Sequence, residues 1–288
     1  MAQMKSISGV SAGLSRSAVL VLAAGLALTT LSACDHKKDK GSASNMPPAT
    51  VAPLGYAKTD PDAQVSLTLP DPIKLYPELH TRLFNAGKQT LTDFIASAHK
   101  DRAEQSADGI EVPAYYHAIN WKISAQSSRF LSLYAEEDDF QGGAHPNSTF
   151  QALLWDKSAN DLINTGKIFA TGADLSNVDT FVCKQIEAER SKRAGQPVSQ
   201  ANDGLECPKI ADSRLILIPS TVTGKIGAVD ALFAPSEVAP YAEGPYEVRI
   251  PQQQLQGLIA PEFADQFAGD AVKDVALPDP DSSNDKAP

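Results

Sequence analysis

Two stretches of the chain place apolar residues at helical spacing. The first runs from Tyr76 to about Gln105, and charged residues separate its apolar positions, which are Leu79, Leu83, Phe84, Leu91, Phe94, Ile95 and Ala98. The second runs from Leu175 to Arg193, and Gly195 and Pro197 beyond it are typical of a helix end. The pattern therefore predicts two long amphipathic helices.

Elsewhere apolar and polar residues alternate, as they do in strands with one buried face. Strands are predicted at Val65–Leu69, Ile119–Ser124, Leu131–Glu136, Phe150–Trp155, Arg214–Ile218, Ile226–Phe233 and Tyr246–Ile250. Phe150–Trp155 is nearly all apolar, which favours a strand covered on both faces. Helices do not alternate strictly with strands, so we expect a single α+β domain with a mainly antiparallel sheet and two longer helices.

The start of the chain has the features of an export signal. Lys5 and Arg16 precede the apolar stretch Ala18–Leu31, which is shorter than the roughly 20 residues of a membrane span. These features predict a signal peptide over residues 1–33. Leu31–Cys34 reads LSAC and resembles a bacterial lipobox, which implies acylation of Cys34. The alternatives are cleavage after Ala33 without a lipid, or a short anchor helix.

The pattern also divides the exported chain into three parts. Residues 34–62 are rich in small, polar and proline residues and are predicted to form a disordered tether. Residues 63–268 carry the helical and strand patterns and form the expected domain. Residues 269–288 are acidic and almost free of large apolar residues, which predicts a disordered tail.

Cysteine count and charge narrow the picture further. Besides Cys34 the chain has Cys183 and Cys207, which we expect to form a disulfide outside the cytoplasm. Two free thiols and half of a zinc site are the alternatives, and no histidine lies near either cysteine to support the latter. The full sequence has a net charge of −10, and loss of Lys5 and Arg16 makes it −12. We therefore expect basic partners and no nucleic acid.

The most unusual stretch joins an acidic run to a glycine-rich segment. Glu136, Glu137, Asp138 and Asp139 precede Phe140–Asn147, which reads FQGGAHPN and contains Gly142, Gly143 and His145. Glycine pairs, proline and asparagine favour a turn between two strands, with the acidic run at a solvated hairpin end. A loop that contacts a partner is the first alternative. A metal or catalytic site is the second, because an imidazole near carboxylates can act as a base or ligand.

Recognised enzyme motifs are absent from the sequence. No HExxH or GxSxG sequence is present, and the acidic run lacks the spacing of a calcium-binding EF-hand. Lys167 and Lys225 follow Thr-Gly but precede isoleucine, so neither belongs to a phosphate-binding loop. We predict no catalytic residue, metal site or cofactor.

Three spaced motifs resemble one family. FQGGAHPN is followed by TGKIF at Thr165–Phe169 and by LFAPSEVAPYAEGPYEVRIPQQQL at Leu232–Leu255. Together they resemble the RsiV/PdaC-like extracytoplasmic domain, a domain of unknown function with an aromatic-x-GGAH motif, over residues 63–268. Phe140 stands where tyrosine is more usual, and Gln252 where an aromatic residue is common.

The resemblance implies an α+β fold and export. One branch of the family is the outer part of an anti-sigma factor that binds lysozyme, and another precedes a peptidoglycan deacetylase domain. We expect neither a sigma-binding segment nor a separate deacetylase domain here. The family implies no catalytic residues.

We therefore expect a lipid-anchored protein of the bacterial cell envelope that faces the periplasm from the inner or the outer membrane. Its expected role is non-catalytic binding or envelope maintenance. The expected ligand is a basic protein such as lysozyme, or peptidoglycan and related cell-wall glycan. The alternative is a small envelope hydrolase that uses His145 and the nearby carboxylates.

Overall fold

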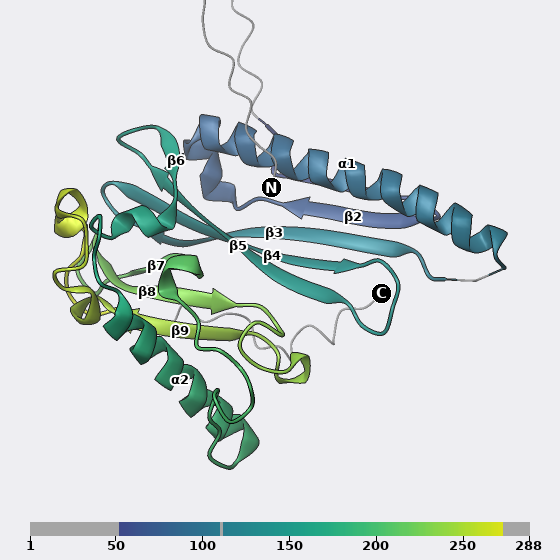
Figure 1. The fold of residues 1–288 in the computed structure, drawn as a ribbon. Coiled ribbons are helices and arrows are strands. Elements are labelled where there is room, and N and C mark those ends of the chain that lie inside the picture. The colour runs from purple at the N-terminus through teal and green to yellow at the C-terminus, as the bar shows by residue number, and fades with distance from the viewer. Residues whose placement is uncertain (1–51, 110–111, 273–288) are drawn as a thin grey trace, which may run out of the picture. The chain divides into compact units, whose positions relative to one another are not determined.

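The computed structural model describes residues 52–109 and 112–272, which all belong to one compact unit (Figure 1). The expected signal peptide, Cys34, most of the expected tether and most of the acidic tail lie outside these residues. Within them, no helix is both long enough and apolar enough to cross a membrane.

Nine strands form two sheets in the described residues. The first sheet has the order β1–β6, and its strands are β1 (Gly55–Thr59), β2 (Ala63–Thr68), β3 (Tyr115–Gln126), β4 (Phe130–Phe140), β5 (Asn147–Asp156) and β6 (Asp161–Ile163). The second has the order β7–β9, with β7 (Arg214–Pro219), β8 (Ile226–Phe233) and β9 (Tyr246–Pro251). All neighbouring strands are antiparallel except β2 and β3. That parallel pair needs a long crossover connection, which includes helix α1.

The two long helices occur where the apolar spacing predicts them. They are α1 (Pro77–Ala107) and α2 (Ser176–Ala194). Short 3-10 helices connect the other elements, and they are η1 (Asp71–Leu75), η2 (Thr165–Ile168), η3 (Ile210–Asp212), η4 (Tyr241–Glu243), η5 (Gln252–Leu255) and η6 (Pro261–Gln266). The α+β prediction, with a mainly antiparallel arrangement and two longer helices, is confirmed.

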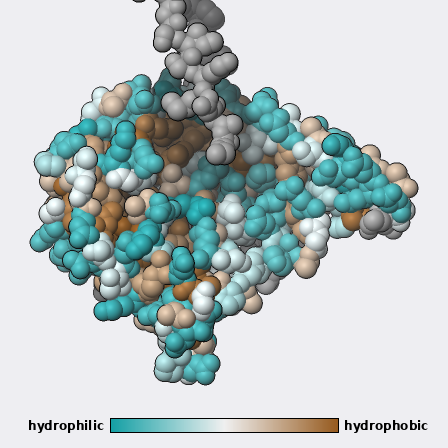
Figure 2. Space-filling model, in the orientation of Figure 1, coloured by the Kyte–Doolittle hydropathy of each residue, from teal (hydrophilic) through white to brown (hydrophobic). Residues whose placement is uncertain are grey.

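The elements stack in the order α1, first sheet, second sheet, α2 (Figure 1). Apolar residues of α1, including Leu79, Leu91 and Ile95, pack against one face of the first sheet. The other face carries Tyr134 and Phe150, which pack against the second sheet. Hydrophilic residues dominate the face seen in Figure 2, and hydrophobic residues show mainly in a hollow beside the N-terminal end of α1.

The second sheet explains a difference from the alternating pattern of β4. Leu131 and Leu133 were expected to be buried, with Ser132 and Tyr134 on a solvated face. In the structure Phe130–Ala135 are all buried, because the second sheet covers the opposite face. The Ser132 hydroxyl oxygen accepts two hydrogen bonds there, from the Ser124 hydroxyl at 2.9 Å and from the Leu217 backbone N–H at 3.0 Å.

The predicted boundaries of the ordered domain are too narrow. The tether prediction, residues 34–62, is wrong at its end because Gly55–Thr59 form β1, which backbone hydrogen bonds hold against β2. Its side chains are mostly exposed, so no apolar pattern reveals it. The tail prediction, residues 269–288, is wrong at its start, since Val272 donates a backbone hydrogen bond to Pro219 at 2.9 Å. Residues 273–288 lie outside the described chain.

The predicted disulfide is present. It joins Cys183 in α2 to Cys207 in the connection that follows, with Cα atoms 5.2 Å apart and 24 positions of sequence separation. The bond fastens the segment after α2 to the helix itself.

We predict that the double variant Cys183→Ala/Cys207→Ala lowers the free energy of unfolding by about 3 kcal/mol, because a cross-link over a loop of this length restricts the unfolded chain. Urea denaturation measures the change. Wild-type protein in reductant is the control and should match the variant. A variant as stable as the oxidised wild type would contradict the prediction.

Candidate functional site

The glycine-rich segment forms the turn between β4 and β5, as predicted. Gly142 and Gly143 have φ angles of 87° and 107°, a region that residues with a Cβ rarely adopt. The two glycines therefore serve the backbone of the turn.

His145 has a specific partner far away in the sequence. Its ring stacks on Tyr241 of η4, with centroids 3.8 Å apart and planes inclined by 23°. Its Nδ1 lies 2.8 Å from the Pro146 carbonyl oxygen, and the Tyr241 hydroxyl donates to that same oxygen at 2.6 Å. We call His145, Pro146 and Tyr241 the clasp. It joins two of the three motifs that carry the family resemblance.

A buried arginine fixes the element that carries Tyr241. Arg190 of α2 is only 3% exposed and donates to both carboxylate oxygens of Glu243, at 2.9 and 3.1 Å. The Tyr246 hydroxyl donates to the same carboxylate at 2.5 Å. The hydrogen bond from Arg190 lowers the pKa of Glu243 despite the opposing effect of burial. These bonds hold η4 in place beside the turn.

The acidic run lies at the turn end of the β4–β5 hairpin, as predicted, and it belongs to the strand itself. Glu136–Asp139 are part of β4, opposite His117–Asn120 of β3 and Asn147–Phe150 of β5. Because neighbouring side chains of a strand point to opposite faces, Glu136 and Asp138 face one way and the other two face the opposite way. The run is therefore not one patch. The apolar pattern could not reveal this, since polar residues within a strand and within a turn look alike.

Partners differ among the four carboxylates. Glu136 forms an ion pair with Lys122 at 2.6 Å, and Glu137 lies 3.7 Å from Nε2 of His117. Asp138 accepts a hydrogen bond from the Ser148 hydroxyl. Asp139 accepts from the side-chain amides of Gln141 and Asn147, at 3.0 and 3.2 Å. Glu137 also accepts from the side-chain amide of Gln151, so Glu137, Asp138 and Asp139 all have neutral hydrogen-bond partners.

Two stacked pairs of aromatic rings lie at the same end of the hairpin as Asp138 and Asp139. Tyr116 stacks on Phe140 with centroids 6.1 Å apart. Burial raises the pKa of Tyr116, and the nearby charges of Asp138 and Asp139 and the proximity of Tyr241 act in the same direction. We call this set the aromatic–acidic end, and its members are Tyr116, Asp138, Asp139, Phe140, His145 and Tyr241.

The alternative, a hydrolase that uses His145 and the nearby carboxylates, finds no carboxylate among the ring and Nδ1 contacts of His145. Those contacts are to Tyr241 and Pro146. The histidine beside the acidic run is His117, which also packs edge-on against Phe94 at 5.1 Å. Imidazole and carboxylates that are close in sequence thus have different neighbours in space.

The structure contains a second charged cluster, which no sequence pattern indicates. Asp60, Asp62 and His99 bring three potential metal-binding atoms within 4.8 Å of one another. His99 Nδ1 lies 2.7 Å from Asp62, whose other oxygen accepts from Arg102 at 2.9 Å, and this hydrogen bond from Arg102 is the main cause of the lowered pKa of Asp62. The cluster fastens the β1–β2 turn to α1. Its aspartates fall in the region predicted to be a tether, which is why they were missed.

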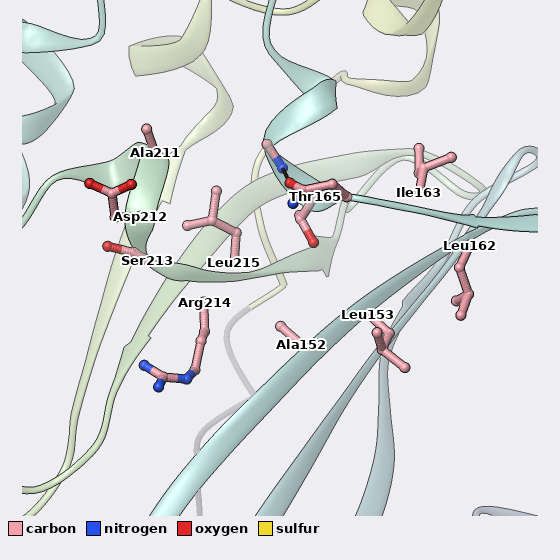
Figure 3. Close-up of a pocket in the computed structure, with 12 residues that line it drawn as sticks. Ala152, Leu153, Leu162, Ile163, Thr165, Ala211, Asp212, Ser213, Arg214 and Leu215 are labelled. Carbon is pink, nitrogen blue, oxygen red and sulfur yellow. Dashed lines mark hydrogen bonds between the residues drawn. The ribbon is translucent and has the colours of Figure 1, made fainter. Parts of the chain in front are cut away.

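The third family motif, TGKIF at Thr165–Phe169, lies away from the clasp. Thr165 and Gly166 of the TGKIF motif line a pocket of about 400 Å³ with Leu153, Leu162, Arg214 and Leu215 (Figure 3). Only Thr165 among the polar lining residues is buried. The motif is therefore separate from the clasp.

Comparisons with known proteins agree with this architecture. A family model described as "Deacetylase PdaC" matches residues 59–148. Immunogenic protein MPB64 of Mycobacterium bovis and immunogenic protein MPT64 of Mycobacterium tuberculosis are each 25% identical over 203 residues, which cover 70% of this chain and 80% of theirs.

Two solved structures align with this chain, and the first has a similar fold. A member of the DUF3298 family from Bacteroides fragilis aligns with a TM-score of 0.50 and 14% identity over 70% of this chain and 85% of its own. A DUF3298 family protein from Pseudomonas aeruginosa PAO1 aligns with a TM-score of 0.43 and 18% identity, over 76% of this chain and 99% of its own. The findings support a PdaC-like extracytoplasmic domain. The relation to RsiV and the lipid anchor stay predictions.

We predict that Tyr241→Ala increases the mobility of the β4–β5 turn, and that Tyr241→Phe increases it less. The phenylalanine ring keeps the stacking on His145, worth about 0.5–1.5 kcal/mol, and loses only the hydroxyl bond, of similar worth. Amide hydrogen exchange of Gln141–His145 measures this mobility. Equal exchange in wild type and Tyr241→Ala would show that the clasp does not restrain the turn.

We also predict an acid-dependent contribution from Glu243. Its folded pKa is lowered by Arg190, so its stabilising effect is present above the ordinary carboxyl value of 4.5 and is lost as the pH falls through the lower folded value. Lowering the pH from 6 to 3 should therefore lower the melting temperature of the wild type more than that of Glu243→Gln. Thermal unfolding at each pH measures the difference. Parallel curves for the two proteins would argue against this role.

Proposed function

We propose that this protein is a lipid-anchored, non-catalytic binding protein of the cell envelope, and that its aromatic–acidic end binds a basic protein. The observation that carries the proposal is the position of Asp138 and Asp139, one on each face at the turn end of the β4–β5 hairpin, where both charges act on Tyr116 and where the Tyr116–Phe140 and His145–Tyr241 stacks lie. Lysozyme is the partner that the family resemblance implies. The PdaC-like domain supports the envelope location.

Electrostatics favours a cationic partner. The exported chain carries −12, which is the −10 of the full sequence without Lys5 and Arg16. Asp138 and Asp139 have neutral hydrogen-bond partners, so their charges are available to an incoming lysine or arginine. Such charges at a rim act chiefly by raising the rate of association.

The rings supply the second half of the recognition. The exposed ring of His145 lies against half-buried Tyr241, and an arginine or lysine can pack over such an aromatic face. The Arg190–Glu243 bonds hold η4 in advance, so binding does not have to order the tyrosine. A rigid aromatic pair at the same end of the hairpin as the carboxylates thus suits a basic partner.

A cell-wall glycan is the second candidate ligand. The stacked His145–Tyr241 pair favours it, because the C–H face of a sugar packs on aromatic rings. The carboxylates and amides around Asp139 would accept and donate hydrogen bonds to sugar hydroxyls. This candidate predicts binding that responds weakly to salt, in contrast to the basic protein.

Catalysis is the weaker proposal. The matching family model is described as a deacetylase, and Asp60, Asp62 and His99 are the metal-binding candidates among the described residues. These donors fit a cation poorly, because Arg102 bonds Asp62 and two backbone N–H groups bond Asp60. Acetate release from peptidoglycan by the purified protein, abolished by His99→Ala, would reverse this ranking.

The anchor has its own prediction. Because Leu31–Cys34 resembles a lipobox, Cys34→Ala should move the protein from the membrane to the soluble fraction. Globomycin, which blocks the lipoprotein signal peptidase, should make a larger precursor accumulate in wild-type cells. Membrane retention of Cys34→Ala together with unchanged processing under globomycin would rule out the anchor.

We predict saturable binding of lysozyme that weakens with salt, since the screening length falls from about 10 Å at 0.1 M to about 3 Å at 1 M. Asp138→Asn/Asp139→Asn should lower the association rate about 5-fold in surface plasmon resonance. Tyr241→Ala should mainly speed dissociation, because it removes the aromatic pair.

The matched control is Glu206→Gln/Asp265→Asn, which changes the net charge equally at exposed positions elsewhere. It should alter the rate less than 2-fold if local charge, rather than total charge, steers the partner. An equal loss in both double variants would contradict the site. Absence of saturable binding at low salt would exclude lysozyme.

A further inference from the structure

One edge of the first sheet is left open along most of a strand. β6 pairs only with Leu154–Asp156 of β5. The preceding seven residues, Asn147–Leu153, pair with β4 on one side and have no backbone partner on the other within the described chain. In an antiparallel ladder, alternate residues of such an edge direct their N–H and C=O groups outward. This row of groups is a template for another strand.

The open edge lacks the features that usually prevent strand addition. Such edges are commonly protected by lysine, proline, a bulge or a very short strand. Asn147–Leu153 reads NSTFQAL and contains neither a charged residue nor proline, and its pairing with β4 is regular. By contrast, the strand at the opposite edge, β1, is short and carries Lys58. The β5 edge is therefore the accessible one.

Two pockets flank this edge on opposite faces of the sheet. A pocket of about 250 Å³ on the α1 side is lined by Leu83, Gly87, Trp121, Gln151, Leu153 and Leu162. The pocket of about 400 Å³ in Figure 3 lies on the side of the second sheet, and Ala152 is among its lining residues. Leu153 and Leu162 line both pockets, so the two open at the same point of the edge, where β6 ends.

We propose that an extended segment of a partner polypeptide adds as a strand along Asn147–Leu153, with consecutive side chains in the two pockets. Backbone hydrogen bonds to the edge hold the segment, and the alternation of side chains along a strand places neighbours on opposite faces. This site goes beyond the proposed function and does not depend on it.

The linings specify the chemistry of the two side chains. The α1-side pocket is formed mainly by Leu83, Ile119 and Trp121, so it takes an apolar side chain. The other pocket has an apolar floor that includes Leu215, with Thr165, Asp212, Ser213 and Arg214 around it. It takes a larger side chain with a polar end. The partner segment is thus an apolar residue next to a long one with a polar end, in extended conformation.

A second copy of this chain is a poorer occupant. Its own β5 would approach the edge with Phe150, which is only 8% exposed because it packs in its own core. The neighbouring residues, Thr149 and Gln151, are polar and do not match the apolar pocket on the α1 side. A segment with free side chains on both faces satisfies the edge and both pockets together.

The test selects dodecapeptides from a random phage-displayed library on the mature full-length protein in detergent micelles. Selected peptides are then measured by fluorescence anisotropy. Ala86→Phe and Ala211→Phe place a ring at the mouth of each pocket from an exposed position, and each should weaken binding at least 10-fold. The matched controls, Asn85→Phe and Ala201→Phe, change exposed residues outside the pockets and should stay within 2-fold.

Backbone methylation of the peptide distinguishes strand addition from binding by side chains alone. Two peptides are compared, one methylated at the backbone nitrogens of its odd-numbered residues and one at those of its even-numbered residues. Methylation of one set should abolish binding, and methylation of the other should change the affinity by less than 3-fold, because only one set of N–H groups faces β5. Ala86→Phe and Ala211→Phe should leave the rate of lysozyme association within 2-fold, which separates this site from the aromatic–acidic end.

Three results would overturn the proposal. The first is that no peptide is enriched above the level found with an unrelated control protein. The second is that the two methylated peptides lose affinity equally. The third is that the pocket variants and the control variants bind the peptide equally well. Self-association of the protein that Ala86→Phe and Ala211→Phe abolish would assign the edge to a second copy instead.

Discussion

The packing of the second sheet on the first determines where polar chemistry can occur. Tyr134 and Phe150 meet Ile216, Ile218 and Leu232 across this contact, and each buried apolar side chain contributes about 1.5–3 kcal/mol. The cover weakens along β4, since Tyr134 is buried, Glu136 is half-buried and Asp138 is exposed. Burial raises the pKa of Tyr134 to about 12, with Glu136 and Glu247 contributing their negative charge. Beyond that point the same strand becomes an acidic surface.

Arg190 connects the far layer of the domain to that surface. It is buried in α2, yet it bonds Glu243 in the element that carries Tyr241. Breaking a buried ion pair of this kind by removing one partner costs about 3–5 kcal/mol, so the position of η4 is strongly constrained. Tyr241 then restrains the β4–β5 turn through His145 and Pro146. A turn that would otherwise be mobile is thereby placed by a core interaction.

Elements with a local periodicity could be predicted from the sequence. Contacts between residues far apart in the sequence could not. Helical spacing located α1 and α2, and an even cysteine remainder located the disulfide. β1 was missed because it is held by backbone pairing and exposes its side chains. The contact between His145 and Tyr241 joins residues about 95 positions apart, and no local pattern encodes such a pairing. The glycine turn was predictable, but its restraint was not.

The TGKIF motif has a structural consequence that links it to the open β5 edge. Asn164 follows β6 directly, and its side chain accepts a hydrogen bond from the Gly166 N–H at 2.7 Å. This bond starts η2 and turns the chain away from β5 after only three paired residues. A longer β6 would cover Asn147–Leu153 and close both pockets. The turn therefore keeps the edge accessible, and the clasp keeps the other end of the same hairpin rigid. A partner strand would thus meet a preorganised edge, which lowers the entropic cost of binding.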